Sequence, residues 1–88
     1  MRHKIAGKNY KIVIDARLKD AHGICTDPAR PRPTIKVTRG LSEAVFLETV
    51  LHEALHASAY QLLSEGFVSE CAADLAGLLL KLGYSRNG

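Results

Sequence analysis

The chain has 88 residues, of which 47% are hydrophobic and 24% are charged, and its formal net charge is +3. This length predicts a single domain over residues 1–88 and excludes a large cofactor-binding fold or a repeat array. A domain this short buries only about 60% of the surface of its unfolded chain, so a bound metal ion is one common means of support.

Residues 1–41 are typical of strands and loops. Tyr10–Ile14 and Thr34–Thr38 are rich in β-branched residues and predict two strands, and a third short strand is expected at His22–Cys25. All three prolines lie between Cys25 and Thr34, where they remove backbone donors and predict a loop. We therefore expect a small antiparallel or mixed sheet of two or three short strands.

From Ser42 the hydrophobic period becomes that of a helix. Ser42 predicts the N-cap of a first helix over residues 42–60, and Ser64 predicts the N-cap of a second helix over residues 64–83 that ends at Gly83. The connection between them is short, so we expect an antiparallel helical hairpin packed on the sheet, an α+β fold. One buried face of the second helix is predicted from its apolar residues, which are Phe67, Val68, Cys71, Ala72, Leu75, Leu78, Leu79 and Leu82.

The first helix contains His52-Glu53-Ala54-Leu55-His56, which is the pattern H-E-x-x-H. Residues four apart lie on the same helical face, so both imidazoles can reach one ion at about 2.0–2.1 Å. Glu53 lies about 100° round the helix from His52, where it can accept a proton from metal-bound water without binding the metal itself. Two neutral nitrogens and a carboxylate favour Zn²⁺.

A catalytic zinc of this kind needs a third protein ligand and one open position. Three acidic residues of the second helix could supply it, namely Glu65, Glu70 and Asp74. The hairpin geometry favours Glu65, and the helical wheel places Glu70 furthest from the buried face. Glu70 stays the alternative because its spacing from Asp74 resembles that of the ligand and the neighbouring acid in thermolysin-type gluzincins. Asp74 is expected beside the ligands, where its carboxylate would bind a histidine N–H and fix the tautomer, or else as a solvated surface acid.

Several other residue types carry weaker signals. Cys25 and Cys71 are expected to be free thiols, and Tyr10, Tyr60 and Tyr84 are alternative oxyanion donors or ordinary packing residues. The cationic residues are scattered along the sequence, which favours a solvated surface and makes nucleic acid an unlikely partner. With no signal peptide and no apolar run of about 20 residues, we expect a soluble, cytoplasmic protein without membrane contact.

The run from Leu47 to Ala57, the segment Ser64-Glu-Gly-Phe-Val and the Asp74-Leu-Ala segment together resemble small phage-type zinc metallopeptidases. These are minimal zincins, loosely grouped with SprT-like and ImmA/IrrE-like proteins. The resemblance implies a zincin-like fold and a peptidase with His52 and His56 as ligands and Glu53 as base, and Glu65 and Asp74 match positions associated with the group. The downstream histidine of SprT proper is missing, and the metzincin histidine is replaced by Leu62.

The combined expectation is a zinc metallopeptidase that acts on a peptide or protein substrate, which a partner protein could present. We expect the substrate to lie extended along Thr34–Thr38 as an added strand. Two other classes stay open. One is a non-catalytic structural or regulatory zinc protein, with Cys25 or Cys71 closing the fourth position, and the other is a small basic nucleic-acid-binding module.

Overall fold

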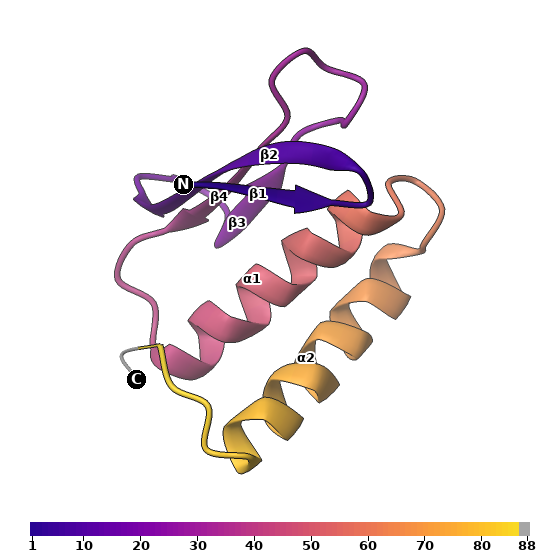
Figure 1. The fold of residues 1–88 in the computed structure, drawn as a ribbon. Helices are drawn as coiled ribbons and strands as arrows, with labels where there is room; N and C mark the ends of the chain where they lie inside the picture. The colour runs from indigo at the N-terminus through magenta and orange to yellow at the C-terminus, as the bar shows by residue number, and fades with distance from the viewer. Residues whose placement is uncertain (87–88) are drawn as a thin grey trace.

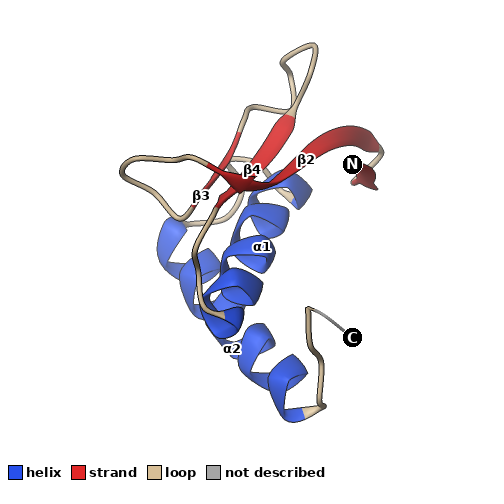
Figure 2. Ribbon diagram, turned by 90° about the vertical axis from the view of Figure 1, so that its left-hand side faces the viewer, coloured by secondary structure: helices blue, strands red, loops and turns tan. Residues whose placement is uncertain are grey.

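The computed structural model describes residues 1–86 and shows an α+β protein, as predicted. Its elements in chain order are β1 (Arg2–Ile5), β2 (Lys8–Ala16), β3 (Gly23–Cys25), β4 (Thr34–Thr38), α1 (Glu43–Ser58) and α2 (Glu65–Lys81). Figure 1 shows the sheet above α1, with α2 on the other side of α1. Both helices lie on one side of the sheet, so the opposite face of the sheet is uncovered (Figure 2).

The four strands form one mixed sheet in the order β1-β2-β4-β3. β2 and β4 are parallel, whereas β1 and β3 pair antiparallel with their neighbours. β4 therefore has a hydrogen-bonded strand on each side, and the expectation that Thr34–Thr38 accepts a substrate strand is wrong. β3, on the far side of β4 from β2, is the edge strand at this end of the sheet.

The sequence analysis did not predict β1, because Ile5 is its only strongly apolar residue. The strand forms through a two-residue turn at Ala6 and Gly7, whose φ angles of 48° and 80° are those of a type I′ hairpin. This turn matches the twist of the flanking strands and brings β1 alongside β2.

The inner face of the sheet supplies most of the core. Tyr10, Ile35 and Val37 are buried there together with Ala57 of α1. Alternate residues of a strand point to opposite faces, so Ile35 and Val37 face α1 while Lys36 between them is half-buried on the opposite face. Burial of each aliphatic side chain stabilises the fold by about 1.5–3 kcal/mol.

Both helices begin at the predicted caps. The Oγ of Ser42 accepts a hydrogen bond from the N–H of Val45 at 3.3 Å, and the Oγ of Ser64 accepts one from the N–H of Phe67 at 3.1 Å. α2 ends as predicted before Gly83, which has a φ of 86°. Within residues 1–86, no helix is long and apolar enough to cross a membrane.

The predicted buried face of α2 is wrong in its orientation. Its buried residues are Val68, Ala72 and Ala76, whereas Phe67 and Leu78 are each 54% exposed. The reason is that α2 packs against α1 and, within the described chain, against no strand. Only the half of the apolar face that meets α1 is covered, and the other half faces solvent.

Candidate metal centre

Helix α1 brings the two histidines of the H-E-x-x-H pattern together. His52 and His56 are one turn apart, and their Nε2 atoms lie 3.2 Å from each other. The rings meet edge to face, with centroids 4.9 Å apart. Both nitrogens point toward the start of α2, so a third group from that helix can join them.

Glu65, the first residue of α2, supplies that third group. Its Oε1 lies 2.8 Å from the Nε2 of His52, and its Oε2 lies 2.9 Å from the Nε2 of His56. The turn that connects the helices ends at Ser64, so the cap that starts α2 also fixes the position of the carboxylate. The side chain of Glu65 is 69% exposed, which leaves this end of the cluster open to solvent.

His52, His56 and Glu65 form a group that could hold a metal ion, with one ligand atom of each residue within 4.8 Å of the others. Two imidazole nitrogens bound to one tetrahedral ion at about 2.0–2.1 Å lie roughly 3.3–3.4 Å apart, because the angle between them is close to tetrahedral. The 3.2 Å between the two Nε2 atoms is close to that separation. Two imidazoles and one carboxylate also leave a fourth position for water or substrate.

Glu53 lies beside this group but is not part of it. The side chain extends from α1 toward β3, and only 7% of the residue is exposed. Burial raises the pKa of its carboxyl group, and Glu65 adds to that rise, while His52 and His56 oppose it. A buried carboxyl group with a raised pKa, beside a group that could hold a metal ion, is suited to accept and return a proton.

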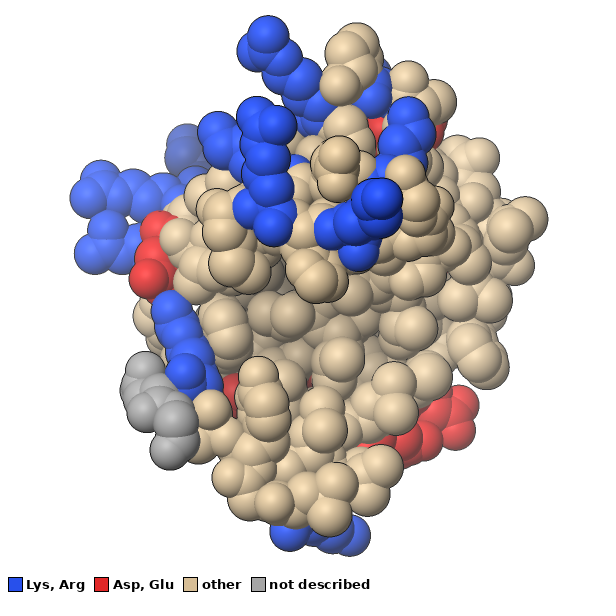
Figure 3. Space-filling view, in the orientation of Figure 1, with Lys and Arg blue, Asp and Glu red and all other residues tan. Residues whose placement is uncertain are grey.

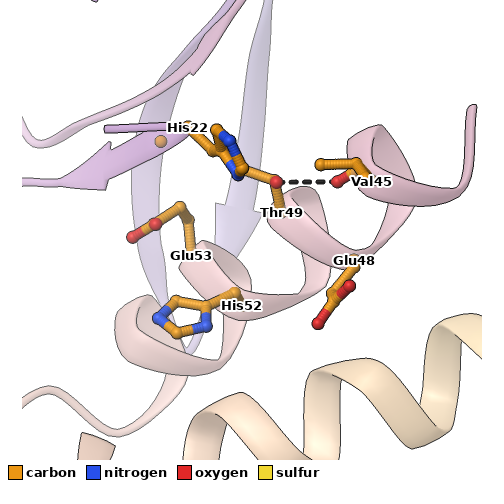
Figure 4. Close-up of a pocket in the computed structure, with 7 residues that line it drawn as sticks. His22, Val45, Glu48, Thr49, His52 and Glu53 are labelled. Atoms are coloured by element: carbon orange, nitrogen blue, oxygen red, sulfur yellow. Dashed lines mark hydrogen bonds between the residues drawn. The ribbon is translucent and has the colours of Figure 1, made fainter. Parts of the chain in front are cut away.

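Two pockets meet at His52, Glu53 and Gly23. The first has a volume of about 460 Å³ and contains the three candidate ligands, together with Ile24, Cys25, Tyr60, Gln61 and Leu63. The second, of about 390 Å³, continues along α1 and is also lined by His22, Val45, Glu48 and Thr49. Figure 4 shows Glu53 and His52 extending from adjacent positions of α1, whereas Glu48 points away from them. We call the two pockets together the candidate-site groove.

One wall of the candidate-site groove is the free edge of β3. The carbonyl of His22 and the N–H of Thr26 are bonded to β4. Since pairing alternates along an antiparallel strand, the N–H and C=O groups of Gly23 and Cys25 point to the unpaired side. An extended chain could therefore hydrogen-bond to β3 next to Glu53.

Gly23 was missed as a functional position, although a glycine within a predicted strand signals a close approach of backbone. A Cβ atom at Gly23 would lie 2.7 Å from the Cγ2 of Thr49 and 3.1 Å from the Oε2 of Glu53. The absence of a side chain thus lets β3 approach α1 at the point where Glu53 lies. His22 is exposed and also lines the groove.

The structure does not bring the other two acidic residues to the histidines. Glu70 and Asp74 are both exposed, and they line a separate pocket on α2 with Phe67, Cys71 and Leu75. In the described residues, no hydrogen bond or ion pair joins Asp74 to His52 or His56. The turn between the helices brings the start of α2 to the histidines, whereas Asp74 lies more than two turns further along.

The three tyrosines lie in different surroundings. Tyr60 lines the groove, while Tyr10 lies in the core, where its hydroxyl has no hydrogen-bond partner, and Tyr84 is exposed. Both cysteines are free thiols, as predicted. Burial, with a smaller contribution from Glu53, raises the pKa of the Cys25 thiol to about 11, so this thiol is neutral at physiological pH.

Comparison of the chain with protein-family models, with curated proteins and with solved structures found no match.

Proposed function

We propose that this protein is a zinc-dependent metallopeptidase of the minimal zincin type. The observation that carries the proposal is the convergence of His52, His56 and Glu65 from two helices, with the buried Glu53 beside them and outside the cluster. A structural metal site has no need of a buried, unbound carboxylate on a solvent-accessible groove. Metal-assisted hydrolysis needs such a group as its base.

In this proposal His52, His56 and Glu65 hold the metal ion. Zinc bound there would lower the pKa of a bound water to about 7 and polarise a carbonyl group. Glu53 takes the proton from the attacking water and delivers it to the leaving amine. Its raised pKa favours this role, since a carboxylate with a raised pKa is a stronger base.

The substrate would be a peptide segment in extended conformation. The backbone groups of Gly23 and Cys25 on the open edge of β3 would hydrogen-bond to it, so the peptide adds as a further strand. The groove continues past Glu53 on both sides, which provides space for residues before and after the cleaved bond. This arrangement moves the proposed substrate strand from β4 to β3.

The proposal is tested with Glu53→Gln, which keeps the shape of the side chain and removes its basicity. We expect zinc content near one equivalent, measured by mass spectrometry, and hydrolysis of a labelled unfolded protein reduced by about 10²–10⁴-fold. Glu70→Gln is the matched control, because it removes the same charge from an exposed site outside the groove. Equal hydrolysis by the Glu53 variant and the wild type would remove the general-base assignment.

A non-catalytic zinc protein is the second candidate function, because Cys25 lines the same pocket as the ligands. Its neutral thiol would have to lose a proton to bind the metal. The same measurements separate the two functions, since a structural site would hold zinc in the wild type without any hydrolysis that a chelator abolishes.

A further inference from the structure

The charges of this protein are unequally divided between its sheet and its helices. Residues 1–41 contain ten Lys and Arg but three acidic residues, a formal charge of +7, whereas residues 42–88 have a formal charge of −4. Figure 3 shows most of the Lys and Arg side chains gathered over the sheet half of the molecule. Cationic residues that are scattered along the sequence thus become neighbours in space.

The strand registers place many of these cations on the uncovered face of the sheet. Ile12 of β2 packs into the core, so Lys11 before it points to the opposite face. Arg2 of β1 is directly opposite Lys11 and shares its face, and Lys36 of β4 is opposite Val13 of the same face. Lys4 follows Arg2 by two residues and joins them. We call Arg2, Lys4, Lys11, Lys36 and the adjacent Arg32 the cationic sheet face.

Three of these cations line one hollow. Arg2, Lys11 and Arg32 come from β1, β2 and the loop before β4, and they surround a depression of about 610 Å³. Its other lining residues are Met1, Asn9, Pro31 and Pro33, so no acidic group is among them. A hollow with converging cations and no carboxylate is suited to a phosphate group.

The charge of this face is not neutralised within the protein. Over residues 1–86, the single ion pair between a Lys or Arg and a carboxylate joins Arg86 to Asp15. Like charges directly opposite on neighbouring strands are destabilising, and Arg2 and Lys11 are such a pair. A bound polyanion would relieve this repulsion.

We propose that the cationic sheet face binds the phosphodiester backbone of duplex nucleic acid without sequence specificity. The face contains no aromatic side chain, so it lacks the stacking platform on which single strands bind. Its exposed large apolar side chains are Met1 and Ile24, and it has none of the Trp and Tyr residues that lie at membrane interfaces. Long cationic side chains around an open depression are suited to contact phosphates.

The proposed binding face and the candidate-site groove lie on opposite sides of the sheet. α1, which holds His52 and His56, covers the inner face, whereas the cationic sheet face is the outer one (Figure 2). The nucleic acid would therefore leave the groove accessible. This inference does not depend on the proposed peptidase activity, because it needs neither metal nor hydrolysis.

The experiment measures binding of the full chain to a fluorescent 20-base-pair mixed-sequence duplex, with chelator present so that the metal centre makes no contribution. About five phosphate contacts predict a slope of log K against log salt of about −4.5, which is a loss of about 500-fold in affinity between 50 and 200 mM salt. Lys11→Glu should weaken binding about tenfold and make the slope shallower by about 1. Lys81→Glu on α2 changes the net charge equally and should stay within twofold of the wild type.

Each alternative result overturns the proposal. Absence of duplex binding at 50 mM salt would do so, as would equal losses from Lys11→Glu and Lys81→Glu in proteins that melt like the wild type. Tighter binding to a single strand of the same length would show a different nucleic-acid site. Binding to vesicles with 30% phosphatidylserine but not to duplex would assign the face to membranes instead.

Discussion

Replacement of Gly23 by alanine tests the close approach of β3 to α1, on which the geometry of the groove depends. The φ of Gly23 is not in the left-handed region, so alanine fits its backbone and any cost is steric. The new methyl group would lie 2.7 Å from the Cγ2 of Thr49, whereas carbon atoms in ordinary contact are about 3.5–4.0 Å apart. The strand or the helix must therefore move by about 1 Å.

Insertion of a methyl group into a packed contact costs about 1–3 kcal/mol, and the reduced entropy of the unfolded chain returns about 0.4–1 kcal/mol. We expect Gly23→Ala to lower the free energy of unfolding by about 1–2 kcal/mol. For a domain of this size, that corresponds to a decrease in Tm of roughly 4–16 °C. Because the new methyl group would also contact the carboxylate of Glu53, the proposed general base, peptide hydrolysis should fall as well.

A double-mutant cycle identifies the contact. Thr49→Ser removes the methyl group that collides but keeps the hydroxyl, which donates to the carbonyl of Val45 at 2.7 Å. Alone it should cost about 0.5–1.5 kcal/mol, and the double variant should be more stable than the sum of the single changes by about 1 kcal/mol. Gly77→Ala on α2 is the control, since nothing lies within 4 Å of its Cβ position, and it should stabilise by about 0.5–1 kcal/mol. Two results of denaturant melts would refute the reasoning. One is a double variant whose change in the free energy of unfolding equals the sum of the single changes, and the other is a Gly23→Ala variant as stable as the wild type.

Three further outcomes are expected. Glu65→Ala should lose bound zinc in a stoichiometry measurement while Glu70→Ala keeps it, and the reverse result would reassign the third ligand. In a Cys71→Ser background, alkylation of Cys25 should rise with a midpoint near pH 11 in the folded protein and near pH 8.5 in denaturant. Because the pKa of the Cys25 thiol is higher in the folded state, the free energy of unfolding falls as the pH rises between these two values. Coincident midpoints would contradict the burial argument. Val68→Ala should cost about 1–2 kcal/mol and Leu78→Ala less than 1 kcal/mol in thermal melts, because Val68 is fully buried and Leu78 is 54% exposed.

The features that the sequence determined are those set by local geometry. A spacing of four residues places His52 and His56 on one face of any helix, and Ser42 and Ser64 can cap only the helices that begin beside them. The β-branched segments likewise predicted β2 and β4. In each case the residues involved are close together in the sequence, so the prediction does not depend on how helices and strands pack against each other.

Tertiary structure determined which residues of different helices and strands lie next to each other. The exposed half of α2 could not be read from its periodicity, because the same apolar face is buried or exposed according to whether a helix contacts one neighbour or two. The identity of the edge strand depended on strand order, which placed β3 and not β4 beside Glu53. The gathering of Arg2, Lys11 and Arg32 depended on strand register and on the loop before β4. Distances between segments remote in sequence are fixed by how surfaces pack, and that information is spread over the whole chain.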